Sequence, residues 1–209
     1  MTNIAVFASG RGSNFQTIYQ RIQEGYLSAR IVVLISDKAS AGAVQFAREH
    51  EIPVYVLNPA QYPSAERFGN ELIGILSSHR VQFIVLAGYL KKIPANVVTR
   101  YENRIVNIHP ALLPAFGGKG MYGMRVHQAV FNSGAKVSGV TVHLVNNEYD
   151  AGPIVLQKSV DISDCDSPEA IAERVLVEEH RAFPQALKLL LENEYVIDHN
   201  RVKIKETKK

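Results

Sequence analysis

The sequence predicts an α/β protein built on an open, twisted, mostly parallel sheet with helices on both faces. Short β-branched runs alternate with segments of helical periodicity through the first half of the chain. The run at residues 31–35 is apolar throughout, as expected for a parallel strand covered on both faces, and right-handed crossovers wind such strands into an open sheet. From residue 138 onward the pattern becomes alternating and turn-rich, which predicts an antiparallel C-terminal part.

Composition predicts one folded domain over residues 1–209. Hydrophobic residues make up 46% of the chain and charged residues 21%, which is typical of globular proteins. The longest apolar run, residues 83–90, is shorter than the ~18 residues of a membrane helix, so we expect a soluble protein without a membrane partner.

Charge and cysteine content indicate which partners and which compartment to expect. The net charge is only +3, and five cations lie in residues 201–209, which gives no support for nucleic-acid binding. Cys165 is the single cysteine and the chain starts directly in a strand pattern, so we expect a cytoplasmic protein without a disulfide or a signal peptide. No CxxC or Cys/His cluster occurs, and we expect no metal site.

The elements follow in βαβ order. Apolar β-branched runs predict strands at residues 4–8, 31–35, 54–57, 83–87 and 105–108. Apolar faces at helical spacing predict helices at residues 13–24, 41–50, 64–78 and 94–101, the first of them stopped by Gly25.

The C-terminal part of the chain does not follow this βαβ order. Residues 138–145 alternate, with Thr141 and His143 on the polar face, which predicts a half-exposed strand; a turn-rich stretch leads to another strand at 154–159. Ser167 followed by proline predicts a helix from 168 to about 182, which Pro184 should kink or restart. A terminal hairpin is expected over residues 195–204, before a frayed basic tail.

A glycine-rich turn, Ser9-Gly10-Arg11-Gly12-Ser13-Asn14, joins the first strand to the first helix. Free amides and the helix dipole favour a phosphate at such a turn. The turn lacks the third glycine of a dinucleotide fingerprint and the Gly-Lys-Ser/Thr ending of a P-loop. The alternative is that Ser13 or Asn14 merely caps the helix.

Asn107 and His109 lie at the carboxyl end of a predicted central strand, where open α/β sheets bind ligands. Side chains alternate along a strand, so the amide and the imidazole point to the same side, and Pro110 keeps His109 extended. This pairing suits the stabilisation of an oxyanion. The alternative is a capping asparagine beside a hydrogen-bonded core histidine.

Asp150 lies in the turn-rich stretch before Gly152-Pro153. Turn aspartates usually bond to their own backbone. If this loop folds over the end of the Asn107 strand, the carboxylate raises the pKa of His109 and accepts a proton. The sequence leaves both possibilities open.

Three segments together carry a resemblance over about the whole chain. They are Gly12-Ser13-Asn14, Asn107-Ile108-His109-Pro110-Ala111-Leu112-Leu113-Pro114, and Val142-His143 leading to Asp150-Ala151-Gly152-Pro153. The chain thereby resembles the phosphoribosylglycinamide formyltransferases, a family within the folate-dependent formyltransferase superfamily.

The resemblance implies a set of site residues. The catalytic residues would be Asn107, His109 and Asp150, with residues 1–100 forming a phosphate and nucleotide half and residues 101–209 a catalytic and folate half. The ribonucleotide would contact Gly12, Ser13, Asn14 and Glu179. The folate would contact Leu90, Lys91, Lys92, Ile93, Asn107 and Asn146. Glu179 also fits a solvated helix position, and Lys91 and Lys92 fit either surface cations or partners of the folate's glutamate tail.

Two departures from the family pattern stand out. An arginine that some members present to folate aligns near Ala65, with Arg67 displaced. The loop at residues 115–124 is longer than in many members, and its glycines fit either a mobile lid or a tolerated insertion.

The resemblance implies transfer of a formyl group from 10-formyltetrahydrofolate, a cosubstrate, to the amine of glycinamide ribonucleotide, without a metal. Asn107 and protonated His109 would stabilise the oxyanion, while Asp150 would support the imidazolium and accept a proton. A methionyl-tRNA formyltransferase, a formyltetrahydrofolate deformylase and a non-catalytic nucleotide-binding module are the rivals. The expected partners are the two small substrates, with the chain a monomer or a homodimer.

Overall fold

The structure is a computed structural model that describes residues 1–205 and divides into two compact units. The first unit contains residues 1–107 and 145–147. The second contains residues 108–144 together with the described chain from residue 148 onward. The end of the expected basic tail, residues 206–209, lies outside the described residues.

The first unit is a parallel sheet in the strand order β3-β2-β1-β4-β5. The strands are β1 (Thr2–Phe7), β2 (Ala29–Ser36), β3 (Val54–Val56), β4 (Phe83–Leu86) and β5 (Ile105–His109), the last of which ends in the second unit. The chain reverses its direction of travel across the sheet between β1 and β4, which is the switch point where α/β sheets bind ligands. All five predicted parallel strands are therefore confirmed.

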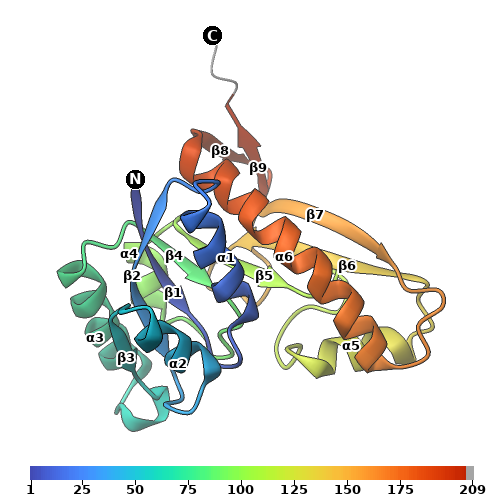
Figure 1. Ribbon diagram of the computed structural model, residues 1–209, viewed down its shortest axis with the longest axis horizontal. Helices are drawn as coiled ribbons and strands as arrows, with labels where there is room; N and C mark the ends of the chain where they lie inside the picture. Colours follow the sequence, from blue (N-terminus) through green and yellow to red (C-terminus); the bar gives the residue numbers. More distant parts are fainter. Residues whose placement is uncertain (206–209) are drawn as a thin grey trace. The chain divides into compact units, whose positions relative to one another are not determined.

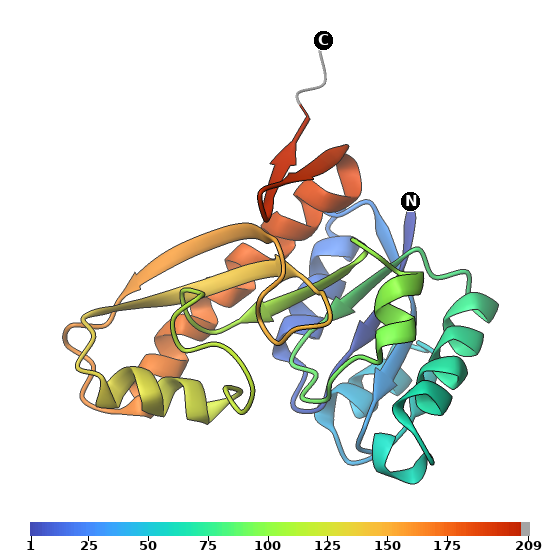
Figure 2. The same ribbon diagram turned by 180° about the vertical axis from the view of Figure 1, so that it is seen from behind.

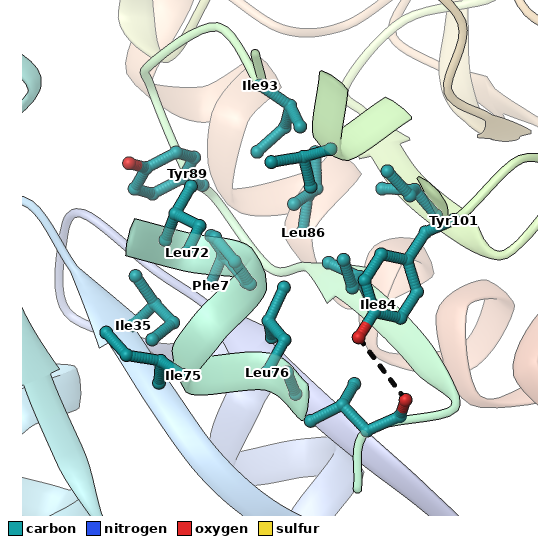
Figure 3. Packing of buried hydrophobic residues seen from close by; sticks show 14 of the residues in the cluster. Phe7, Ile35, Leu72, Ile75, Leu76, Ile84, Leu86, Tyr89, Ile93 and Tyr101 are labelled. Carbon is teal, nitrogen blue, oxygen red and sulfur yellow. Dashed lines mark hydrogen bonds between the residues drawn. The ribbon is translucent and has the colours of Figure 1, made fainter. Parts of the chain in front are cut away.

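Helices cover both faces of this sheet (Figures 1 and 2). They are α1 (Ser13–Gln23), α2 (Gly42–Glu49), α3 (Ala65–Ser78) and α4 (Ala95–Arg100), with a short 3₁₀ turn at Pro59–Gln61. Buried side chains of α3 and α4 pack on Phe7, Ile35 and Ile84 from the strands (Figure 3). The Tyr101 hydroxyl in this core donates a hydrogen bond to the Val81 carbonyl at 3.4 Å.

The second unit contains the antiparallel strands. β6 (Val137–Leu144) pairs antiparallel with β7 (Ile154–Asp161), and β8 (Tyr195–Asp198) forms a hairpin with β9 (Arg201–Ile204), which lies parallel to β7. α5 (Met124–Asn132) and α6 (Pro168–Glu192) pack against each other, and α6 packs on β6 and β7 (Figure 1). The predicted mixed α/β fold class is confirmed.

The structure corrects two local expectations and adds one helix. β6 is buried on both faces rather than half-exposed, because its predicted polar face is covered by residues 111–113, whose backbone bonds to Thr141. α6 continues through Pro184, since buried apolar residues on both sides of the proline hold the helix in place where a backbone hydrogen bond is lost. α5 was not predicted, because its N-cap is Gly123 and no capping side chain marks its start.

Among residues 1–205, no helix is both long enough and apolar enough to cross a membrane. The same residues contain no group of three or more histidine, cysteine or acidic side chains arranged to hold a metal ion.

Candidate functional site

Strand β5 carries Asn107 and His109 two positions apart. The strand extends to His109, as Pro110 led us to expect, and the side chain of His109 is buried while Asn107 is half-buried. Alternation along the strand directs both side chains to the same face. An amide and an imidazole are therefore placed side by side at the carboxyl end of the parallel sheet's last strand.

The Phe116 carbonyl fixes one nitrogen of the His109 ring. His109 Nε2 lies 2.9 Å from this oxygen, and Phe116 has the left-handed φ of 55° that an aromatic residue rarely adopts. A carbonyl oxygen can only accept, so Nε2 carries the proton in the neutral ring. His109 Nδ1 is then the nitrogen left to exchange a proton with a reacting group.

Asp150 lies between two imidazoles. Its Oδ2 is 3.7 Å from His109 Nδ1, and its Oδ1 is 3.7 Å from His143 Nε2. The Gly118 N–H donates a hydrogen bond to Oδ2 at 2.9 Å, and Asp150 has a φ of 53°. The tertiary structure thus brings Asp150 to His109, which is the alternative in which the loop folds over the end of the Asn107 strand.

His143 is a further imidazole at this site, to which the sequence alone led us to assign no role. The residue is buried on β6, and its Nδ1 lies 2.9 Å from the Leu144 carbonyl. The alternation of residues 138–145, which placed His143 on the polar face, was the signal that marked this imidazole. Because we expected that face of the strand to be exposed to solvent, we did not assign His143 to the site.

Burial has the largest influence on the pKa of His109. Burial lowers the pKa of His109 and His143 acts in the same direction, while Asp150 and the Phe116 carbonyl raise it without overcoming burial. The resting imidazole is therefore neutral near pH 7, where we expected imidazolium. Asp150 does raise the pKa of His109, but the net shift is downward.

The Asp150 carboxylate remains ionised. Burial alone would raise the pKa of Asp150, but the His143 imidazole, the Gly118 N–H and the His109 imidazole together lower it below its ordinary value. A negative charge is thereby kept beside a neutral imidazole that can take up a proton.

His127 on α5 is a third buried imidazole near this centre. Burial, followed by the charge of His109, lowers the pKa of His127 to about 4. It is neutral at pH 7 and adds no positive charge to the site.

Gly117 leaves no room for a side chain. A Cβ at this position would collide with Leu113 Cδ2 and would lie 3.3 Å from Asp150 Cβ. The first residues of the loop at 115–124 are thus packed against Asp150.

We predict that Gly117→Ala lowers kcat about 10- to 100-fold, because the added methyl group must move Leu113 or Asp150, and a misplacement of about 1 Å has costs of this size. Steady-state kinetics will measure the effect. Gly74→Ala, in open space on α3, is the matched control and should leave kcat unchanged. Wild-type kcat in a folded Gly117→Ala variant would contradict this packing argument.

The glycine-rich turn of the first unit lies at the start of α1. Gly12 is the N-cap residue, with a left-handed φ of 81°, and no side chain caps the helix, so the capping alternative for Ser13 and Asn14 is wrong. Asn14 is buried, and Ser13 is half-buried. The first-turn amides are positioned as an anion site requires.

The residues expected to contact folate lie in different environments. Leu90 is exposed, and Lys91 Nζ lies 3.7 Å from the buried Asp37 Oδ2, so Lys91 is a partly neutralised cation. Ile93 is buried in the core of the first unit, whereas Lys92 is exposed. Asn146 is half-buried after β6.

Two further predicted positions can be placed. Glu179 is half-buried on α6 and has an interaction partner, so it is not simply a solvated helix residue. Ala65 is the first residue of α3, and Arg67, in the same helical turn, is exposed.

Comparison with known proteins gives consistent matches. Residues 2–187 match the formyl transferase family. The chain is 46% identical over 190 residues to "Phosphoribosylglycinamide formyltransferase, chloroplastic" of Arabidopsis thaliana, covering 90% of this chain and 65% of the relative. It is 39% identical over 191 residues to "Phosphoribosylglycinamide formyltransferase" of Bacillus subtilis, covering 91% of this chain and 95% of the relative.

Solved structures that resemble this chain belong to the same family. The crystal structure of glycinamide ribonucleotide transformylase 1 from Symbiobacterium toebii superimposes with a TM-score of 0.91 at 39% identity, covering 98% of this chain and 94% of that one. The chain spans less than two thirds of two plant relatives, 65% and 62% of their lengths. Because the family match extends over most of the sequence and includes both β5 and the Asp150 turn, the chain belongs to the formyl transferase family.

Proposed function

We propose that the protein transfers the formyl group of 10-formyltetrahydrofolate to the amine of glycinamide ribonucleotide, a step of purine biosynthesis. The observation that carries the proposal is the approach of Asp150 to His109 Nδ1 while the Phe116 carbonyl engages Nε2. The acceptor follows from the names of relatives, including that of Bacillus subtilis, of which the chain covers 95%.

The chemistry follows from these groups. The substrate amine attacks the formyl carbon, and the formyl oxygen gains negative charge beside the Asn107 amide, which donates a hydrogen bond to it. The attacking nitrogen becomes positive and must lose a proton. His109 Nδ1, unprotonated at rest, accepts this proton directly or through water and forms an imidazolium.

Asp150 makes that proton transfer favourable. Its charge lies 3.7 Å from Nδ1, so it stabilises the imidazolium as it forms. The imidazolium then supports the oxyanion and returns the proton to the departing folate nitrogen. The two residues act as one unit, with His143 on the other side of the carboxylate.

We assign the remaining residues to binding. The turn at Gly12, Ser13 and Asn14 holds the ribonucleotide phosphate, with Glu179 on the nucleotide. We also assign folate contacts to Leu90, Lys91, Lys92, Ile93, Asn107 and Asn146, with the two exposed lysines at the anionic tail of folate. We also assign one formyltransferase domain to residues 1–209, with the nucleotide half at 1–100 and the catalytic and folate half at 101–209.

We infer a cytoplasmic location, which the lone free cysteine supports. We also infer that the protein acts as a monomer or homodimer. Size-exclusion chromatography with light scattering will give the oligomeric state. Cell fractionation will give the location.

The deciding experiment offers one formyl donor to three acceptors. With 10-formyltetrahydrofolate present, we expect formylation of glycinamide ribonucleotide and neither formylated initiator methionyl-tRNA nor free formate. Formate release would indicate a deformylase, such as the Pseudomonas syringae enzyme that the chain matches at 25% identity. No product with any acceptor would overturn the enzymatic proposal.

A test of the phosphate turn must take account of the space around Gly12. An added Cβ would lie 2.8 Å from Ala43 Cβ at a positive φ, so any substitution also strains the turn. Gly12→Ala is preferable to Gly12→Val, and Gly74→Ala, which lies outside the turn and has nothing within 4 Å, is the control.

We predict that Gly12→Ala raises the KM for the ribonucleotide roughly 10-fold or more, because a displaced amide loses a hydrogen bond to a charged group. The KM for folate should stay within about twofold, since a phosphate at this turn belongs to the other substrate. Initial-rate kinetics with each substrate varied will measure both constants. An equal rise in both would remove the phosphate assignment.

A further inference from the structure

Thr141 and Gln157 form a cross-strand pair next to the catalytic residues. They lie directly opposite each other on β6 and β7, and the Gln157 Nε2 donates a hydrogen bond to Thr141 Oγ1 at 3.0 Å. Thr141 is fully buried. Directly opposed residues of an antiparallel pair share a face, so both side chains reach the same neighbouring segment.

That segment is the chain that follows β5. Thr141 Oγ1 donates to the Ala111 carbonyl at 2.7 Å and accepts from the Leu113 N–H at 3.0 Å. Gln157 Nε2 also donates to the Leu113 carbonyl at 2.9 Å. Both backbone polar groups of Leu113 are thus bonded to the side chains of this pair.

The hydroxyl of Thr141 is saturated. A threonine hydroxyl has one hydrogen to donate and two lone pairs to accept, and all three are used here. Removing it would leave buried backbone groups without a partner, which the segment can avoid only by moving.

The held segment determines the surroundings of His109. From Leu113 the chain turns, with the Ala115 N–H bonded to the Leu112 carbonyl at 3.1 Å, and reaches Phe116 in a left-handed conformation. The Phe116 carbonyl then meets His109 Nε2. A shift of residues 111–113 would carry this carbonyl away from the ring.

We propose that Thr141 and Gln157 are positioning residues: by fixing residues 111–113 they place the Phe116 carbonyl against His109 Nε2 and so reserve Nδ1 for the reaction. As a statement about catalysis this rests on the proposed function. As a statement about the ring it can be tested without substrate.

The test compares Thr141→Val, which keeps the shape and removes the hydroxyl, with Thr141→Ser, which keeps the hydroxyl. In Thr141→Val we expect ¹⁵N NMR of the His109 ring to lose the Nε2–H preference. The pKa of His109 should fall, because the Phe116 carbonyl that raises it has moved. Thr141→Ser should restore both signals.

Kinetics supply the second measurement. We expect kcat of Thr141→Val to fall about 10- to 100-fold while both KM values stay within about threefold, since the ring is displaced rather than the binding surfaces. Gln157→Met removes the donor on β7 but leaves the hydroxyl of Thr141, so it provides the same test if Thr141→Val does not fold. Gln128→Met, whose amide bonds to Asn132 on the same helix, is the matched control.

The outcomes separate the two proposals. A changed His109 tautomer and pKa in Thr141→Val or Gln157→Met support the positioning role, even if the wild-type protein does not formylate the ribonucleotide, in which case only the proposed function fails. An unchanged ring in both folded variants overturns the positioning role, even if the wild-type protein is active.

Discussion

Replacing His109 by alanine, or Asn107 by alanine, is expected to lower kcat by about 10²–10³, because each change removes a group that meets the charge formed in the transition state. The KM values should change little, since these contacts strengthen as the oxyanion forms. Steady-state kinetics at saturating concentrations of both substrates will measure the loss.

A control is needed because His109 is buried and its removal creates a cavity. His50→Ala removes a half-buried imidazole that stacks on Phe46 in the first unit, and it should lower thermal stability without changing kcat. Near-normal kcat in His109→Ala or Asn107→Ala would remove that residue from the mechanism.

Asp150→Asn is expected to lower kcat by a similar factor, roughly 10²–10³, while keeping the shape of the side chain. The neutral amide cannot stabilise an imidazolium at His109 Nδ1. Because Asp150 acts through His109, adding Asp150→Asn to His109→Ala should cost much less than the product of the two single losses. Fully multiplicative losses would show that Asp150 works independently of His109.

The pH profile gives the same variant a second readout. The pKa of His109 is already lowered by burial, and Asp150 is the main group that raises it. Removing the carboxylate lowers this pKa further, so the acidic limb of kcat/KM, which reports deprotonation of His109 in the free protein, should move to lower pH. A limb that stays in place, or moves to higher pH, would contradict this assignment.

The pKa of Asp150 also determines how folding stability changes with pH. The pKa of folded Asp150 lies below its ordinary value of 3.8, so the carboxylate stabilises the folded state above the unfolded pKa. This stabilisation is lost as the pH falls through the folded pKa. Asp150→Asn should therefore flatten the loss of thermal stability in this acidic window.

The sequence determined those features that depend on neighbours along the chain. Apolar β-branched runs marked the parallel strands, since a strand covered on both faces requires them, and the turn at Gly12 follows from a conformation that glycine adopts without strain. The common direction of Asn107 and His109 follows from strand alternation alone. These are local consequences of backbone geometry, so no tertiary contact was needed to predict them.

The tertiary structure decided the rest. Whether Asp150 bonds to its own turn or approaches His109 depends on how distant segments pack, and the same packing brings His143 to the carboxylate and the Phe116 carbonyl to the ring. The net direction of the His109 pKa shift also could not be predicted from the sequence, because burial depends on every group packed around the ring and here outweighs the attraction of Asp150. The residues of the proposed chemistry can be found in the sequence, but the protonation of His109 and Asp150 depends on the burial and the neighbouring groups that the fold gives them.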